Sequence, residues 1–193
     1  MKIFGLTGGV GMGKSTSAEI LRARAVPVVD TDELARRLTR PGEPALAEIQ
    51  DAFGQKIIAP DGSLRRDELA RIVFAGPAAR AKLESILHPR IRAAWLAQVE
   101  TWRQENHPLA VVVIPLLFET QAGSCFDKII CVACSAASQH GRLRARGWDE
   151  EQIRRRNAAQ WPVEQKIVRA DFVVWTEGVP AVHQQQWELI VSV

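Results

Sequence analysis

The stretch Gly8–Ser15, GGVGMGKS, decides the fold of this 193-residue chain. It satisfies the pattern G-x-x-x-x-G-K-[ST], which is typical of a loop that binds the phosphates of a nucleotide. Glycines allow the backbone to curl so that successive N–H groups face one anion, and the N-terminus of a following helix adds its positive dipole end. The pattern therefore predicts a binding site for ATP or a similar nucleoside triphosphate.

The residues on either side of the loop agree with this interpretation. Lys2–Thr7 is a short apolar run typical of a buried strand, and Ser15–Arg24 has the composition and apolar spacing of a helix. We expect Lys14 to reach the β- and γ-phosphates and the Ser15 hydroxyl to ligate Mg²⁺. The expected nucleotide contacts form one continuous set, namely Gly9, Val10, Gly11, Met12, Gly13, Lys14, Ser15 and Thr16.

Four further apolar runs alternate with helical patterns and extend this unit into a sheet. These runs are Val26–Asp30, Leu109–Ile114, Lys128–Val132 and Asp171–Trp175. Pro27 cannot donate a backbone hydrogen bond, so we expect only the later part of the second run to pair regularly. The alternation predicts an α/β protein of the P-loop NTP hydrolase-like fold with a five-stranded parallel sheet.

Residues 32–106 lack strand signals and are rich in alanine, leucine and charged residues. They predict a helical domain inserted into a nucleotide-binding core formed by residues 1–31 and 107–193. A helical, arginine-dense stretch at about residues 137–168 is expected to act as a lid within that core. This division predicts one compact protein with one inserted domain.

Composition excludes several other classes of protein. The chain has 47% apolar residues, 24% charged residues and a net charge of +3, so neither a disordered chain nor a nucleic-acid-binding arm is expected. It contains no apolar run of 18 residues, and its three cysteines are an odd count. We therefore expect a cytoplasmic protein with no membrane partner. Cys131 and Cys134 form a C-x-x-C pair, which we interpret as buried strand residues and not as a metal site.

Acidic residues follow the second predicted strand. In an open α/β sheet the carboxyl ends of neighbouring strands face one ligand crevice, so Asp30 and Asp32 are expected near the phosphate loop. A carboxylate in that place can accept the proton of an attacking hydroxyl, and we favour Asp32 for this role. The alternative is that these residues only cap the following helix, because aspartate is a favoured N-cap residue.

Six short motifs in order along the chain resemble the dephospho-coenzyme A kinases. The motifs are GLTGGVGMGKST at residues 5–16, VVDTDELAR at 28–36, GSLRRDELARIVF at 62–74, LESILHPRIR at 83–92, IPLLFE at 114–119 and RNAAQ at 156–160. The resemblance implies an enzyme that uses ATP and Mg²⁺ to phosphorylate the ribose 3′-hydroxyl of dephospho-CoA. It also implies a helical substrate domain and an arginine-bearing lid.

The same resemblance implies contacts with the acceptor or the active site at Thr7, Asp32, Arg36, His88, Arg92 and Leu117. His88 has a second interpretation, because a residue before proline is pushed out of the helical region and His88 could simply end a helix at Pro89. For the lid, Arg142 and Arg146 lie four residues apart and hence on one helix face. We expect these two to neutralise charge in the transition state. Most other arginines nearby are expected to be solvated or paired with Asp149, Glu150 and Glu151.

Two positions depart from the expected patterns. The third strand ends in Val112-Val113-Ile114, where many P-loop enzymes have an acid that organises Mg²⁺, and Thr176 stands where the family has asparagine after the last strand. The second departure leaves the adenine contact open. Two rival functions also remain open, namely another P-loop kinase acting on a nucleoside monophosphate or a sugar acid, and a nucleotide-dependent binding module.

Overall fold

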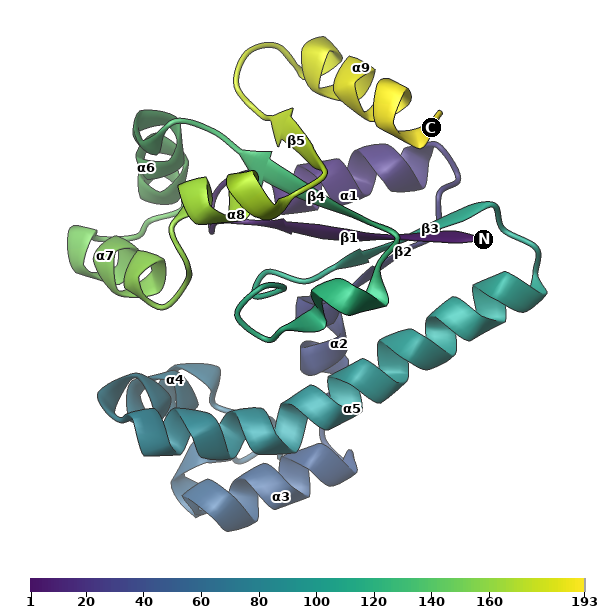
Figure 1. The fold of residues 1–193 in the computed structure, drawn as a ribbon. Coiled ribbons are helices and arrows are strands. Elements are labelled where there is room, and N and C mark those ends of the chain that lie inside the picture. Colours follow the sequence, from purple (N-terminus) through teal and green to yellow (C-terminus); the bar gives the residue numbers. More distant parts are fainter. Residues whose placement is uncertain (193) are drawn as a thin grey trace. The chain divides into compact units, whose positions relative to one another are not determined.

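The computed structural model describes residues 1–192 and confirms the predicted α/β class with a five-stranded parallel sheet (Figure 1). The strands are β1 (Lys2–Gly8), β2 (Val28–Asp30), β3 (Leu109–Val113), β4 (Lys128–Ala133) and β5 (Phe172–Trp175). Their order in the sheet is β2-β3-β1-β4-β5, so β1 is central and pairs with both β3 and β4. As expected from Pro27, β2 begins only at Val28.

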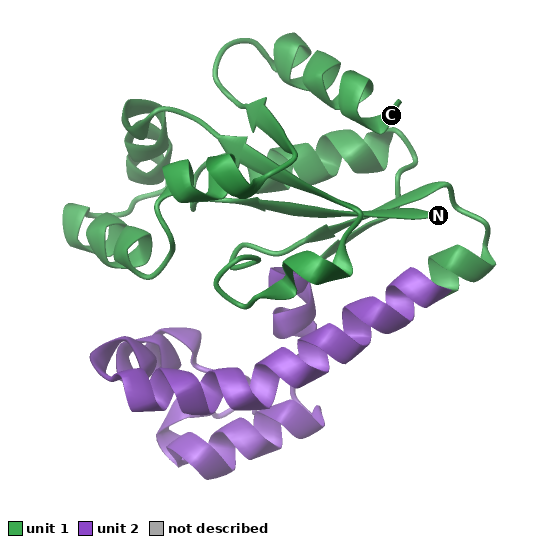
Figure 2. Cartoon of the chain, in the orientation of Figure 1, with its two compact units in different colours: residues 1–30, 101–193 green, residues 31–100 purple. Residues whose placement is uncertain are grey.

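The chain divides into two compact units, residues 1–30 with the chain from 101 onward, and residues 31–100 (Figure 2). The first unit holds the sheet and the helices α1 (Lys14–Ala23), α6 (Ala136–Ala145), α7 (Glu150–Ala158), α8 (Val163–Arg169) and α9 (Pro180–Val191), with the 3₁₀ turn η2 (Ala122–Cys125). The second holds α2 (Thr31–Leu38), α3 (Pro44–Phe53), the 3₁₀ turn η1 (Gln55–Ile57) and α4 (Arg66–Ala75). Helix α5 (Pro77–Gln104) lies mostly in the second unit.

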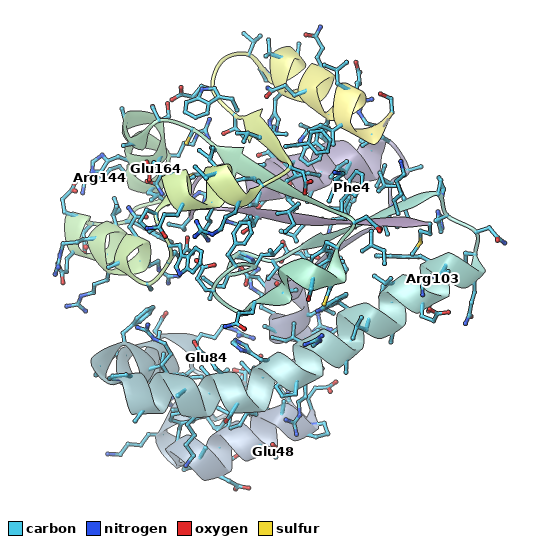
Figure 3. All side chains as sticks on the ribbon, viewed as in Figure 1. Phe4, Glu48, Glu84, Arg103, Arg144 and Glu164 are labelled. Carbon is cyan, nitrogen blue, oxygen red and sulfur yellow. The ribbon has the colours of Figure 1, made fainter. Side chains whose placement is uncertain are left out.

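Side chains alternate between the two faces of the central strand. Phe4 and Leu6 of β1 join a buried cluster with Leu21 of α1 and Trp187 of α9. Figure 3 shows Phe4 inside this part of the molecule. On the opposite face, a Cβ added at Gly5 would lie only 2.7 Å from Cδ1 of Leu117, so glycine is needed there for close packing. Both faces of the sheet are therefore covered, as is usual for parallel sheets.

Helix α8 contacts β1 and β4, and its Lys166 is completely buried. The range of residues 137–168 that the sequence suggests as a lid thus includes a helix that packs on the sheet. Helices α6 and α7 are more exposed, although Leu143 and Ile153 are buried. Within residues 1–192, no helix is both long and apolar enough to cross a membrane.

The helical unit has an apolar core of its own. Ile49, Ile57 and Leu69 are buried there, and side chains of α5 pack against them. The interpretation that a helix ends at His88 is wrong, because α5 continues through Pro89. Proline removes one backbone donor inside a helix. In the same turn the Arg90 guanidinium donates to the Ile86 carbonyl at 2.7 Å, which adds a hydrogen bond where the backbone ladder is weakened.

Candidate active site

The phosphate loop joins the central strand directly to α1. Gly11 and Gly13 have φ angles of +73° and +97°, in the left-handed region that favours glycine. A Cβ at Gly11 would also lie 2.9 Å from Cγ of Leu143, so α6 presses against the loop at this point. Helix α1 begins at Lys14, immediately after Gly13. The loop residues that the sequence predicts as nucleotide contacts therefore lie together at a helix N-terminus.

Lys14 lies at the mouth of this loop. Its Nζ donates to the carbonyl oxygens of Gly8 and Gly9, each at 2.9 Å. Ser15 and Thr16, in the first turn of α1, are exposed. A cationic amine, exposed hydroxyls and the positive end of a helix dipole thus gather at one point, and this combination favours binding of a polyphosphate.

A buried charged network supports the ends of β1 and β3. The Pro115 carbonyl accepts from Thr7 Oγ1 at 3.2 Å and from Lys166 Nζ at 2.8 Å. Lys166 also pairs with Glu119 Oε1 at 2.8 Å, and the same oxygen accepts from the Trp161 backbone N–H at 2.8 Å. The other carboxylate oxygen, Oε2, is buried and accepts no hydrogen bond from the described residues. This network joins the central strands to the start of α8.

Lys166 and its network were missed by the sequence interpretation. A lysine in an amphipathic segment is normally solvated, because lysine is almost never fully buried unless it is paired. Its partner Glu119 lies 47 positions away by residue number and belongs to the IPLLFE motif. The motif marked Glu119 as notable, but no local pattern identified what it binds.

Thr176 follows β5 directly, at the position where the sequence resemblance leads us to expect asparagine. Its hydroxyl donates to the Met12 carbonyl of the phosphate loop at 3.0 Å and accepts from Nη1 of Arg142 at 2.8 Å. The Thr176 carbonyl accepts a second hydrogen bond from the same guanidinium. Threonine therefore connects the loop to α6 in this chain, and Arg142 is held by two hydrogen bonds at one residue.

The arginine-rich segment, which we define as residues 136–160, includes α6 and α7. Arg146 lies one position beyond α6, as its C-cap residue, and follows Arg142 by four residues. The Arg146 side chain is exposed and forms no ion pair within residues 1–192. Exposed Arg144 also belongs to this segment, on α6 (Figure 3).

Several other arginines of the segment have the acidic partners that the sequence predicts. Arg154 and Arg155 pair with Glu151, and Arg144 lies 3.7 Å from Glu150. Asp149 instead caps α7, by accepting from the Gln152 backbone N–H at 2.7 Å in a capping box. Arg156 stacks over the Trp148 ring, 4.6 Å from its centroid. Most of these charges thus face solvent or each other.

The residues predicted to contact the acceptor divide between the two units. Thr7 and Leu117 are completely buried in the first unit, so their side chains contribute to its core in this structure. Arg36, His88 and Arg92 are exposed on α2 and α5 of the helical unit.

Asp32 is exposed in the first turn of α2, and Asp30 is the last residue of β2.

In the helical unit, Arg66 Nη2 donates a hydrogen bond to Thr39 Oγ1 at 2.9 Å. Burial and the nearby charge of Arg36 lower the pKa of Arg66.

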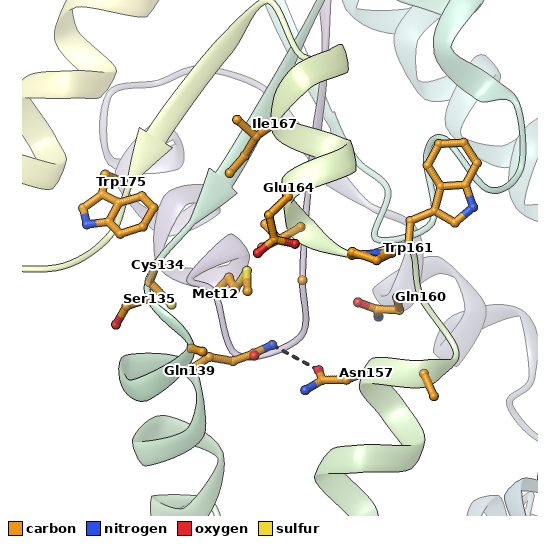
Figure 4. Close-up of a pocket in the computed structure, with 15 residues that line it drawn as sticks. Met12, Cys134, Ser135, Gln139, Asn157, Gln160, Trp161, Glu164, Ile167 and Trp175 are labelled. Atoms are coloured by element: carbon orange, nitrogen blue, oxygen red, sulfur yellow. Dashed lines mark hydrogen bonds between the residues drawn. The ribbon is translucent and has the colours of Figure 1, made fainter.

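A cavity of about 680 Å³ lies beside the phosphate loop (Figure 4). Gly9 and Met12 of the loop line it, together with residues of α6, residues 157–167 and Trp175. Figure 4 shows the side chain of Gln139 extending from α6 toward Asn157. The cavity is thus bordered by the loop and by the arginine-rich segment.

The cysteines are buried as the sequence predicts for Cys131 and Cys134. Burial raises the pKa of the Cys131 thiol to about 11, and burial also raises the pKa of Cys134. Among residues 1–192, no three His, Cys, Asp or Glu side chains gather closely enough to hold a metal ion by themselves. A thiol with a raised pKa is a poor nucleophile and a poor metal ligand at neutral pH.

A glycine loop between a central parallel strand and a helix N-terminus, with lysine and serine at that terminus, defines a P-loop nucleotide-binding protein. The family model for dephospho-CoA kinase matches residues 2–180. The chain belongs to the dephospho-CoA kinase family.

Individual relatives agree with this assignment. A dephospho-CoA kinase from Anaeromyxobacter dehalogenans is 45% identical over 181 residues, which cover 93% of this chain and 86% of that protein. A solved structure from Thermus thermophilus is 32% identical, with a TM-score of 0.86 and coverage of 99% of this chain and 96% of that chain. The solved dephospho-CoA kinase from Campylobacter jejuni is 26% identical, with a TM-score of 0.71 and coverage of 98% and 95%.

Proposed function

We propose that this protein transfers the γ-phosphate of ATP to the ribose 3′-hydroxyl of dephospho-CoA, giving CoA and ADP. The observation that carries the proposal is an intact phosphate loop in a chain that matches the dephospho-CoA kinase family over residues 2–180. In the reaction the bond between the γ-phosphorus and the β,γ-bridging oxygen breaks. A bond from the 3′-oxygen to the same phosphorus forms, and the hydroxyl proton leaves.

The loop and Lys14 hold the β- and γ-phosphates in this proposal. Lys14 Nζ, which now donates to two loop carbonyls, would exchange those acceptors for phosphate oxygens of greater negative charge. Backbone N–H groups of the first turn of α1 would add further donors to the phosphates. Phosphoryl transfer depends mainly on such positioning and charge stabilisation, because the protein has little covalent chemistry to perform.

Mg²⁺ is the metal that the family implies, and the residues near the loop fit it. The Ser15 hydroxyl is exposed in the first turn of α1 and is an oxygen donor of the kind that Mg²⁺ prefers. We assign Ser15 as its ligand from the protein. When held there, Mg²⁺ would supply positive charge that offsets the charge of the phosphates during transfer.

Asp32 is the proposed acceptor of the hydroxyl proton. Its carboxylate is exposed and follows the carboxyl end of β2 by two residues, which supports a role near the reacting hydroxyl. Arg36, His88 and Arg92 are proposed to bind the acceptor, because dephospho-CoA carries phosphates that need cationic or hydrogen-bonding partners. We propose that residues 31–100 form the unit that binds dephospho-CoA.

Arg142 and Arg146 are proposed to contact the phosphates from the arginine-rich segment, which would act as the lid. The free and exposed side chain of Arg146 supports this role, because it has no ion pair to give up within residues 1–192. Arg142 would exchange its bonds to Thr176 for phosphate oxygens. We also propose a cytoplasmic location, in keeping with three free cysteines.

The test is ADP release from Mg-ATP by the purified protein with dephospho-CoA, AMP, adenosine or no acceptor, with the product identified by mass. We expect ADP release only with dephospho-CoA, together with formation of CoA. Activity with another acceptor alone would contradict the assigned substrate but keep a kinase. ATP binding without turnover on any acceptor would favour the nucleotide-dependent binding module.

Asp32→Asn tests the proposed base. It removes the proton acceptor while it keeps the size of the side chain, and we expect turnover to fall by about 10²-fold or more. Glu33→Gln, at the next exposed acidic position of α2, is the matched control and should leave turnover near that of the wild type. Full activity in Asp32→Asn would remove this residue from the mechanism.

A further inference from the structure

We infer that Gln139 is a positioning residue for the phosphate loop, and that it acts with Asn157 and Gln160 through the backbone of Val10. The inference rests on one part of the proposed function, namely that the phosphate loop binds ATP. It assigns a role to three amide side chains that lie outside the loop and that take no part in the proposed chemistry.

Both backbone polar groups of Val10 are bound by side chains from far along the chain. The Val10 carbonyl accepts from Gln139 Nε2 at 2.7 Å, across 129 residues of sequence. The Val10 N–H donates to Gln160 Oε1 at 3.2 Å, across 150 residues. Gln139 Nε2 also donates to Asn157 Oδ1 at 3.1 Å, and the side chain is nearly buried (Figure 4).

These two contacts fix two consecutive peptide planes of the loop. The N–H of Val10 belongs to the peptide that joins it to Gly9, and its carbonyl belongs to the peptide that joins it to Gly11. In a planar trans peptide the C=O and N–H groups point in opposite directions. Gln139 therefore directs the Gly11 N–H away from itself, and this N–H begins the series of loop donors available to a phosphate.

Gln139 and Gln160 differ in the direction of their hydrogen bonds with Val10, because Gln139 donates and Gln160 accepts. Gln139 uses both hydrogens of its nitrogen on two acceptors, so only a donor satisfies this position. Gln160 offers an oxygen to a backbone donor, so any carboxyl or amide oxygen satisfies that position. Glutamate has nearly the same shape as glutamine. At residue 139 it would place a carboxylate oxygen against the Val10 carbonyl oxygen, so that two acceptors face each other. At residue 160 it would keep an oxygen that accepts from the Val10 N–H.

The three amides also belong to the segment that carries the proposed phosphate-binding arginines. Gln139 lies on α6 one turn before Arg142, Asn157 lies in the last turn of α7, and Gln160 follows the end of α7 by two residues. Leu143 of α6 packs where a Cβ at Gly11 would lie. The conformation of the loop and the position of the arginine-rich segment are therefore coupled through Val10 and Gly11.

The experiment compares Gln139→Glu with Gln160→Glu by calorimetric titration of the complete protein with Mg-ATP and no acceptor. We expect Gln139→Glu to weaken ATP binding by about tenfold or more, because a buried hydrogen bond becomes a repulsion. Gln160→Glu adds the same charge beside the loop but keeps the acceptor, so its loss should be at least fivefold smaller than that of Gln139→Glu. Gln165→Glu, at an exposed position on α8, controls for added surface charge and should bind ATP as the wild type does.

Two readouts separate positioning from a general structural role. The ¹⁵N amide resonance of Gly11 should shift in Gln139→Glu, while the KM for dephospho-CoA should stay within about twofold of the wild type. If Gln139→Glu does not fold, Gln139→Met removes the donor without adding charge and is judged by the same criteria.

The inference would be overturned if Gln139→Glu bound ATP with the affinity of the wild type. It would also be overturned if Gln139→Glu and Gln160→Glu lost equal amounts of ATP affinity. Wild-type protein that binds ATP but leaves dephospho-CoA unmodified would contradict the proposed function alone.

Discussion

Lys166 and Arg154 each pair with a glutamate, but they do so in very different surroundings. Lys166 is completely buried, and its partner Glu119 is only 15% exposed. Arg154 is 72% exposed, and its partner Glu151 is 47% exposed. The first pair supports the ends of β1 and β3 below the phosphate loop, whereas the second lies on the surface of the arginine-rich segment.

This difference in burial distinguishes charges with a structural role from charges that can change partners. A buried ion pair cannot lose one member without leaving an uncompensated charge in the interior. An exposed pair gains little, because water and salt screen it and ordering two long side chains costs entropy. The network below the loop should therefore stay fixed during turnover, while the exposed ion pairs of the arginine-rich segment can break at little cost.

The largest expected effect is on stability, in Lys166→Met. Removing the ammonium leaves the Glu119 carboxylate with the hydrogen bond from the Trp161 backbone N–H but without its ion-pair partner. We expect the free energy of unfolding to fall by about 3–5 kcal/mol, as for other buried pairs from which one partner is removed. Urea denaturation measures this loss. The double variant Lys166→Met/Glu119→Gln should recover part of it, because the buried charge is then absent.

Arg154→Met is the matched change in the exposed pair. Its midpoint of urea denaturation should match that of the wild type, because Glu151 remains solvated and keeps Arg155 as a partner. Equal losses in Lys166→Met and Arg154→Met would contradict the distinction between the two pairs.

The next effect is on chemistry and not on folding. Lys14→Ala removes a cation at the mouth of the loop, where its present partners are loop carbonyls. We expect kcat/KM for ATP to fall by about 10²–10³-fold, as when one preorganised donor to a developing charge is removed. Steady-state kinetics measure this, with Lys56→Ala at an exposed position of the helical unit as the control. A large change in the thermal midpoint of Lys14→Ala would show instead that Lys14 belongs to the structural network.

A smaller effect concerns pH and the packing of α9 on α1. The indole N–H of Trp187 can only donate, and it lies 3.2 Å from Nε2 of His183, so this nitrogen is an unprotonated acceptor. Ser17 Oγ lies 2.9 Å from the same nitrogen. Burial, with a contribution from the charge of Arg142, lowers the pKa of His183 below its ordinary value of 6.5.

Because the folded-state pKa is the lower one, the unfolded chain binds more protons as the pH falls below about 6.5. The stability from His183 is therefore complete above that pH and is lost as the pH falls through the folded-state pKa. Urea denaturation between pH 7.5 and 5 should show this decline, and His183→Gln should weaken it. Identical pH dependence in the two proteins would exclude His183 as the cause.

The smallest effect is chemical protection of the core cysteine. The pKa of Cys131 is raised to about 11, so at pH 8 its thiol is almost entirely protonated as well as buried. We expect iodoacetamide to label the partly exposed Cys125 first and to reach Cys131 only after unfolding. Peptide mass mapping measures the order of labelling, and early labelling of Cys131 would show that the sheet opens more readily than its packing indicates.

Local patterns were sufficient for much of the fold and of the candidate site. The phosphate loop, its strand and helix, and the other four strands were predicted because each signal lies within a few neighbouring residues. The course of α5 through Pro89 was not determined, because proline weakens a helix and packing of Leu83, Ile86 and Leu87 on the helical core decides whether the helix continues.

By itself the sequence determined the P-loop, the order of strands and helices and the resemblance to one family, since these depend on residue type and spacing along the chain. Only the tertiary structure decided that Lys166 is buried against Glu119, that Thr176 links Met12 to Arg142, and that Gln139 binds Val10. These contacts join residues between 34 and 164 positions apart. Such pairs meet only after the parallel strands have assembled in the order β2-β3-β1-β4-β5, and no local pattern encodes that assembly.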